Sequence, residues 1–121
     1  MSRFVPEGVE VPLSFGVAAN GWVVVSGQVG HQDFELVPGG FEPEFRQAIV
    51  NLRNVLQSHG ADFKDVVKVN VYLDDIADFG PMNDIWIEAF KAPFPARTAI
   101  AAVLPFGAKV EMEAWAYIGE R

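Results

Sequence analysis

The hydrophobic and polar positions of the chain change their period several times, and each period predicts a different element. Residues 14–30 hold two short apolar runs, rich in β-branched residues, on either side of Asn20-Gly21. Asn-Gly is the pair most typical of a two-residue turn between antiparallel strands, so this segment is predicted to be a β-hairpin. Residues 31–41, which include Pro38-Gly39-Gly40, are predicted to form a loop.

A helix is predicted next, over residues 42–60. Its apolar residues recur at spacings of three and four, which places them on one stripe, and Gly60 is a typical helix stop. The stripe consists of Phe45, Ala48, Ile49, Leu52, Val55 and Leu56. A second helix is predicted over residues 78–95, with Pro81 near its first turn and Pro93 past its end.

Three further strands complete the pattern. Residues 65–75 alternate, with one face made of Val67, Val69, Val71 and Leu73 and the other of Lys68, Asn70 and Tyr72. Residues 97–104 and 108–118 are predicted as two strands joined around Pro105-Phe106-Gly107. The resulting order, β-β-α-β-α-β-β, indicates one α+β domain over residues 1–121, with both helices packed on one face of a mixed sheet.

The face of this sheet away from the helices is also partly apolar. In the last strand, Val110, Met112, Ala114, Ala116 and Ile118 are expected to face the helices, which leaves Glu111, Glu113, Trp115 and Tyr117 on the other side. The strand from Trp22 to Ser26 is apolar on both sides. Two helices cover only one face, so a second copy of the chain is the expected cover, and the sequence predicts a homo-oligomer.

Composition narrows the function. The chain has no cysteine, which excludes disulfides and thiolate chemistry and fits a cytoplasmic protein. Its two histidines, His31 and His59, are expected to be a loop residue and a helix-end residue, so no metal site is predicted. The net charge is −7, without a basic and aromatic run, which disfavours nucleic acid as a partner. No apolar run is long enough to cross a membrane, and the N-terminus lacks a signal-peptide pattern.

Two charged positions stand out in apolar strands. Arg97 is either an exposed strand-end arginine, a partner in a salt bridge, or a desolvated site for an anion, because its planar fork binds carboxylates. Glu111 and Glu113 are either solvated edge residues or carboxylates that need a partner, water or substrate. Ser26 lacks the pattern of a covalent nucleophile, whereas Gly27 would let a ligand approach the backbone.

Four segments together resemble the Rid family, the YjgF-like reactive intermediate deaminases. They are "VSGQVG" (25–30), "QAIVNLRNVLQSHGADFKDVVKVNVYLDDIADFGPMNDIWIEAF" (47–90), "FPAR" (94–97) and "LPFGAKVEMEAWA" (104–116). The resemblance implies a chorismate-mutase-like fold and a homotrimer whose sheets form a central β-barrel, with sites in the clefts between subunits.

The resemblance also implies a reaction and roles for residues. The reaction is the cofactor-free hydrolysis of 2-imino or enamine acids of the 2-aminoacrylate type to a 2-keto acid and ammonia. Arg97 matches the arginine that binds the substrate carboxylate, and Glu111 matches the glutamate that orients water. Ser26, Gly27 and Asn83 match residues that line the pocket, although Asn83 by itself could equally be an exposed polar residue.

The sequence departs from the family pattern at three places. Leu13 stands where a pocket tyrosine is expected, and Phe15 does not replace the missing hydroxyl. Ala99 stands where many members have cysteine, and the segment from Arg97 to Pro105 is one residue shorter than in the best-known branch. Leu13 and the shortened segment favour one alternative, a non-catalytic ligand-binding or regulatory trimer. Two more stay open: a ribonuclease or translation inhibitor, which the acidic charge disfavours, and a chorismate-mutase reaction, which only the fold suggests.

Overall fold

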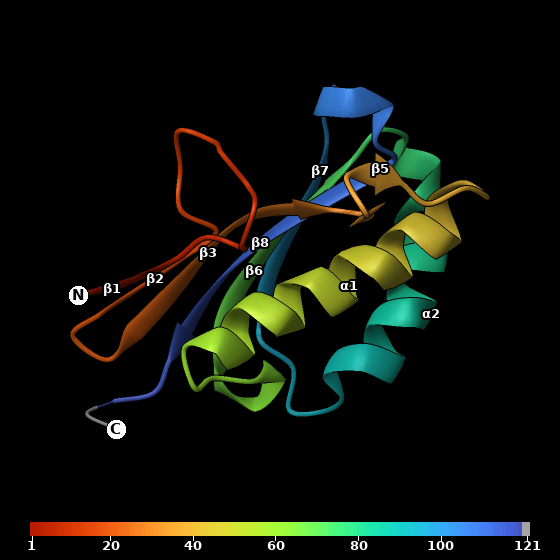
Figure 1. Cartoon of the computed structure of the whole chain (residues 1–121). Helices are drawn as coiled ribbons and strands as arrows, with labels where there is room; N and C mark the ends of the chain where they lie inside the picture. The colour runs from red at the N-terminus through yellow and green to blue at the C-terminus, as the bar shows by residue number, and fades with distance from the viewer. Residues whose placement is uncertain (120–121) are drawn as a thin grey trace.

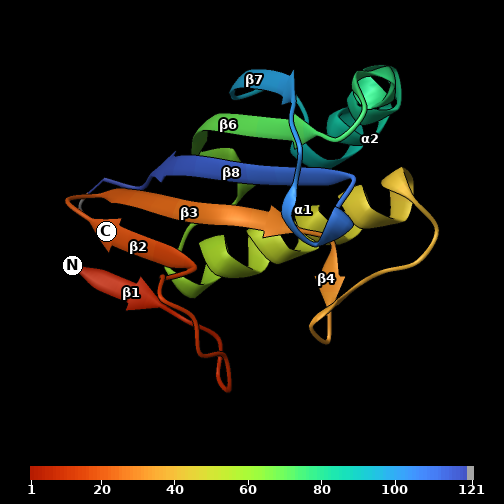
Figure 2. The same ribbon diagram turned by 90° about the horizontal axis from the view of Figure 1, so that it is seen from above.

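A computed structural model describes residues 1–119 as one mixed sheet with two helices packed on one side (Figure 1). The strands are ordered β1-β2-β3-β8-β6-β7, as Figure 2 shows, and only β6 and β7 run parallel. The sheet contains β1 (Ser2–Phe4), β2 (Gly16–Ala19), β3 (Trp22–Val29), β6 (Val66–Leu73), β7 (Ala96–Ala101) and β8 (Val110–Tyr117). The helices are α1 (Phe41–Ser58) and α2 (Phe79–Phe90). The predicted α+β architecture is confirmed.

The predicted hairpin is present as β2 and β3. Its turn residues Asn20 and Gly21 both have positive φ, 52° and 83°, which is why this pair suits the turn. The prediction for residues 31–41 was wrong in part, because they contain a second, two-stranded sheet of β4 (His31–Gln32) and β5 (Glu35–Leu36). Strands of two residues are too short to show an alternating pattern in the sequence.

The predicted faces of β8 are correct, whereas one face of β6 needs a correction. Val69, Val71 and Leu73 are buried as predicted, but Val67 is 45% exposed and Val66 is buried in its place. The register with β8 shifts between Val66 and Lys68, so a bulge reverses the facing of the first residues of β6. A period-two pattern cannot locate such an extra residue.

Helix α1 lies against β3 and β8, and its predicted apolar stripe is the centre of the hydrophobic core. Glu44, in its first turn, is buried as well, and its Oε1 accepts a hydrogen bond of 2.8 Å from the backbone N–H of Lys109. This bond ties the start of α1 to the residue before β8. Helix α2 adds Met82, Ile85, Trp86 and Phe90 to the same core.

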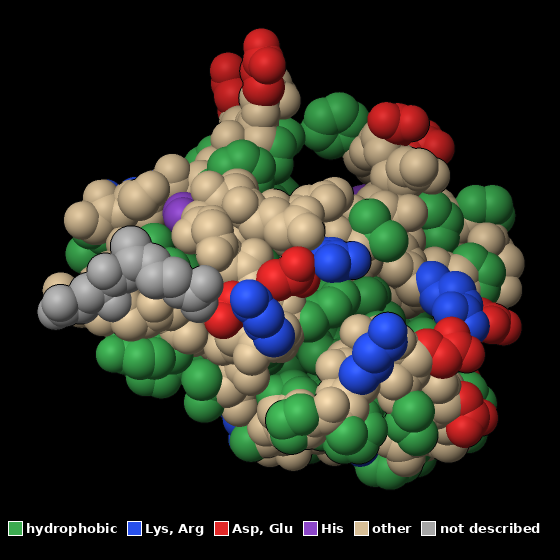
Figure 3. Space-filling view, turned by 90° about the horizontal axis from the view of Figure 1, so that it is seen from below, with side chains coloured by type: hydrophobic (Ala, Val, Ile, Leu, Met, Phe, Trp, Pro, Cys, Tyr) green, Lys and Arg blue, Asp and Glu red, His purple; other side chains and the backbone are tan. Residues whose placement is uncertain are grey.

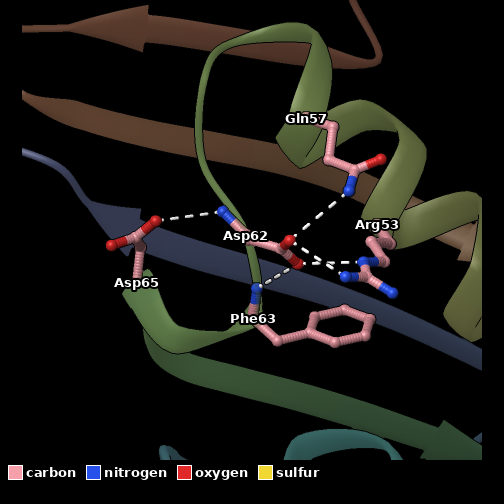
Figure 4. A network of polar contacts seen from close by, with 5 residues as sticks. All are labelled: Arg53, Gln57, Asp62, Phe63 and Asp65. Atoms are coloured by element: carbon pink, nitrogen blue, oxygen red, sulfur yellow. Dashed lines mark hydrogen bonds and ion pairs between the residues drawn. The ribbon is translucent and has the colours of Figure 1, made fainter.

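A polar network fixes the chain where α1 leads into β6 (Figure 4). Both guanidinium nitrogens of Arg53 that face Asp62 donate to its carboxylate at 3.0 Å, and the Asp62 oxygen also accepts from the N–H of Phe63. The Arg53 guanidinium holds the pKa of Asp62 below its ordinary value. The 3-10 turn η1 (Phe63–Asp65) is thereby capped, because Asp65 accepts in return from the Asp62 N–H.

Charged side chains of both signs are mixed on the surface. The face seen in Figure 3 has Lys and Arg next to Asp and Glu around an apolar hollow, and it carries no continuous basic patch. The sheet face away from the helices instead exposes large apolar side chains. They include Trp22, Val24, Val67, Ile100 and Tyr117, each between 39% and 50% exposed.

Candidate active site

Arg97 lies on β7, an edge strand of the sheet. Its Cα partner on β6 is Val69, a core residue, so the Arg97 side chain is on the face that carries the helices. There the guanidinium carbon is 4.9 Å from the ring centroid of Trp86 and 5.5 Å from that of Phe79, both on α2. The guanidinium is therefore placed over aromatic rings, which attract a cation electrostatically.

The charge of Arg97 has no carboxylate partner in the part of the chain that the structure describes. Arg46 and Arg53, in contrast, bind the carboxylates of Glu42, Glu88 and Asp62. Partial burial lowers the pKa of the Arg97 guanidinium from its ordinary value, although an arginine stays charged at neutral pH. A partly desolvated cation with free N–H donors is suited to bind an anion in bidentate fashion.

Two more predicted residues lie beside Arg97. Asn83 is four residues after Phe79 and three before Trp86, so it shares the side of α2 that these rings present. Ala99 follows Arg97 on the same face of β7 and packs against the core. We refer to Phe79, Asn83, Trp86, Arg97 and Ala99 as the arginine half-site.

Glu111 lies on β8, on the opposite face of the sheet. It alternates with the buried residues Val110 and Met112, and its Cα partner on β6 is Tyr72. Its carboxylate packs against Gly27 so closely that a Cβ at Gly27 would be 2.8 Å from both Cδ and Oε2. A larger residue at position 27 would displace the Glu111 carboxylate, whereas Gly27 is itself exposed and leaves room beside it.

Burial, and then the charge of Glu113, raise the pKa of Glu111 above its ordinary value. Glu113 is two residues along the same face and is held by two donors from β6: the Tyr72 hydroxyl at 2.6 Å and the Asn70 side-chain amide at 3.2 Å. Within the described residues, the Glu111 carboxylate accepts no such bond. It is thus the carboxylate left available to water or a ligand, and its raised pKa makes it a better proton acceptor.

Ser26, the neighbour of Gly27 on β3, contacts the segment before β2. The Ser26 hydroxyl donates to the backbone oxygen of Ser14 at 2.6 Å, and the Ser26 N–H donates to the oxygen of Phe15. Leu13 precedes this contact and is 51% exposed, whereas Phe15 packs against the core. We refer to Leu13, Ser26, Gly27 and Glu111 as the glutamate half-site.

The two half-sites lie on opposite faces of one sheet. The side chain of Arg97 is on the helix face, and that of Glu111 is on the open face, with β6 between their strands. Within one chain, the Arg97 guanidinium is therefore not placed to keep the Glu111 carboxylate ionised. A ligand that contacts both residues would have to lie between two copies of the protein.

Comparison with known proteins shows what this architecture is. Residues 7–118 match the family described as Endoribonuclease L-PSP. A bovine protein named 2-iminobutanoate/2-iminopropanoate deaminase is 42% identical over 111 residues, which are 89% of this chain and 81% of the relative. The chain belongs to the Rid/YjgF/L-PSP family.

Solved structures of Rid-family proteins superpose over nearly the whole chain. A RidA crystal structure from an Antarctic Psychrobacter species has a TM-score of 0.86 at 33% identity and covers 96% of this chain and 94% of its own. Escherichia coli TdcF with bound serine has a TM-score of 0.82 at 27% identity, with 91% of each chain covered. The resemblance stated from the motifs alone is confirmed.

The segment from Arg97 to Pro105, which the motifs predict to be one residue short, includes most of strand β7. The strand ends at Ala101, and residues 102–109 are irregular apart from the 3-10 turn η3 (Pro105–Gly107). A change of length within residues 102–109 would lie outside both β7 and β8. The opposite facing of Arg97 and Glu111 results from the strand pairing instead.

The sequence pattern missed the aromatic rings under Arg97 and the partners of Glu113. Trp86 and Phe79 are seven residues apart, a spacing that places them on one side of a helix. Arg97 is 11 positions beyond Trp86, on a strand, and only the fold shows that its side chain meets these rings. The His31 ring is tilted against that of Phe106, with ring centroids 4.9 Å apart, and His59 follows the end of α1. Residues 1–119 contain no cluster of metal-ligating side chains and no helix able to span a membrane.

Proposed function

We propose that the protein hydrolyses 2-imino acids and their enamine tautomers to 2-keto acids and ammonia. Water adds to the imine carbon, the C–N bond of the resulting carbinolamine breaks, and nitrogen leaves as ammonia while oxygen remains as the keto group. The relatives named 2-iminobutanoate/2-iminopropanoate deaminase, at about 42% identity over 89% of the chain, support this reaction. The bound serine of TdcF supports an amino-acid-like ligand.

The observation that carries the proposal is the unpaired guanidinium of Arg97. It offers a carboxylate two parallel hydrogen bonds, and its desolvated position strengthens them. We assign to Glu111 the role of accepting a proton from the attacking water and returning it to the departing nitrogen. Imines hydrolyse in water without a catalyst. One positioned general base, which accelerates such a reaction by roughly 10²–10⁴-fold, is therefore sufficient.

We also propose that the site is completed by a second copy of the chain. In one copy the two half-sites lie on opposite faces, but β7 is an edge strand whose outer side is free to meet a neighbour. A homotrimer with the open sheet faces turned inward would cover Trp22, Val24 and Ile100 and bring Arg97 of one copy to Glu111 of the next. Asn83, Ser26 and Gly27 would line this cleft.

Sedimentation tests the assembly directly. At micromolar concentration we expect a single species with three times the mass of the chain, because the large apolar side chains on the open face need cover. A monomer that still hydrolyses imines would contradict the shared cleft, since its Arg97 and Glu111 could not reach one substrate.

The reaction is tested with imino acids made in place. An amino-acid oxidase generates them from aliphatic, aromatic and acidic amino acids, and semicarbazide traps whatever imine remains. The wild-type protein is expected to lower the trapped imine for at least one side-chain class, with ammonia released in equal amount. If the amount of trapped imine is unchanged for all three classes, the deaminase proposal fails and the hypothesis of a non-catalytic binding trimer is favoured.

A further inference from the structure

Trp86 is a core residue that also forms one wall of the arginine half-site. Its side chain is 4% exposed, and its ring stacks on that of Phe90 at a centroid distance of 4.1 Å and an angle of 26°. Phe90 in turn contacts Phe63, with centroids 4.7 Å apart. These contacts hold the Trp86 ring in one position against the sheet.

Arg97 depends on this ring for its own position. An arginine side chain has several rotatable bonds, so an unpaired one on an edge strand would sample many conformers. Here the Arg97 side chain packs against two rings of α2, whose centroids are 4.9 Å (Trp86) and 5.5 Å (Phe79) from the guanidinium carbon. A guanidinium that lies against ring faces keeps its in-plane N–H donors directed away from them.

We propose that Trp86 is a positioning residue, which holds the Arg97 guanidinium over its ring so that the N–H fork is ready for a carboxylate. This inference rests on the proposed function, because the carboxylate is that of the 2-imino acid or its 2-keto acid product. On this proposal, helix α2 and strand β7 together fix where the carboxylate binds. Phe79, 39% exposed, is a weaker second wall.

The test measures binding of a stable carboxylate, pyruvate, to the assembled protein by calorimetry, together with KM and kcat for imine hydrolysis. Trp86→Met removes the ring but keeps an apolar side chain, and we expect it to weaken pyruvate binding and raise KM by about three- to thirtyfold, the range of a partly to fully desolvated cation–π contact. The value of kcat should change less than KM. Trp86→Phe restores a ring and should recover most of the affinity.

Ile85→Ala is the matched control, because Ile85 is a buried neighbour on α2 whose aliphatic side chain has neither a ring nor a charge to offer Arg97. If Ile85→Ala weakens pyruvate binding as much as Trp86→Met, the effect is loss of packing and the inference is overturned. Wild-type affinity in Trp86→Met overturns it as well, as does a wild type that binds no pyruvate.

Two further results separate this inference from the proposed function. A wild type that binds pyruvate but leaves imine trapping unchanged contradicts the reaction, while the Trp86 comparison is still decided by pyruvate affinity. If Trp86→Met does not fold, Phe79→Leu replaces it. Weaker pyruvate binding in Phe79→Leu then supports positioning of Arg97 by the rings, and unchanged binding counts against it.

Discussion

Arg97→Ala is expected to lower kcat/KM for imine hydrolysis by about 10²–10³-fold, the usual loss when one partner of a buried charge pair is truncated. The reason is that the substrate carboxylate would enter a partly desolvated cleft with no cation to meet it. Most of the loss should appear in KM, because the carboxylate is bound equally in the ground state and the transition state. Initial rates in the semicarbazide assay over a range of imine concentrations give both constants.

Two variants make this result specific. Arg97→Lys keeps the charge but loses the planar fork, so it should recover only part of the activity. Arg46→Ala removes an exposed arginine that binds Glu42 and Glu88 on the surface, and its kcat/KM should equal that of the wild type. A fully active Arg97→Ala would show that the guanidinium does not bind the substrate.

Glu111→Gln is the second large effect, and it should appear in kcat. The amide has the size of the carboxylate and fits against Gly27, but it cannot accept the proton of the attacking water. Loss of one general base lowers the rate by about 10²–10⁴-fold, with KM nearly unchanged because Arg97 still binds the carboxylate. Single-turnover rates at saturating imine concentration measure this loss.

Glu113→Gln is the matched control on the same face of β8. Its carboxylate already accepts hydrogen bonds from Tyr72 and Asn70, so it is not free to act as the base. We therefore expect a much smaller decrease in kcat for Glu113→Gln than for Glu111→Gln. A loss as large as that of Glu111→Gln, or larger, would mean that the wrong carboxylate has been assigned.

The pH dependence follows from the same two residues. Glu111 must be ionised to accept a proton, so activity is lost as the pH falls through its pKa, which burial and Glu113 raise. Because the charge of Glu113 raises the pKa of Glu111, Glu113→Gln should move the acidic limb of kcat/KM to lower pH. In the proposed assembly the guanidinium of a neighbouring copy would act in the opposite direction, so Arg97→Ala should move the limb to higher pH.

The raised pKa also has a consequence for stability. The folded chain binds the Glu111 proton more tightly than the unfolded chain, so the stabilisation that this proton gives is complete below the unfolded pKa. It is lost as the pH rises through the folded pKa. Glu111→Gln should therefore raise Tm at neutral pH, and the gain should vanish below about pH 4, where glutamate is protonated in both states.

Much of the fold follows from local pattern. The Asn20-Gly21 turn, the stripe of α1 and the alternation of β8 each depend on neighbours within a few residues, and each is present as predicted. The exposed apolar face opposite the helices also followed from alternation alone. Arg97 and Glu111 were recognisable because charged residues in apolar strands cost free energy unless they have a partner.

What only the tertiary structure decided is how these residues are placed relative to one another. The bulge at Val66–Lys68 is an extra residue in a strand pair, and nothing in one strand's own period records it. The parallel pairing of β7 with β6 brings Arg97 opposite Val69 and under the rings of α2, away from Glu111. Side-chain facing depends on which strand is the partner and in what register. The sequence by itself therefore identified Arg97 and Glu111 as candidate site residues, and the pairing of strands decided that one chain holds them on opposite faces of the sheet.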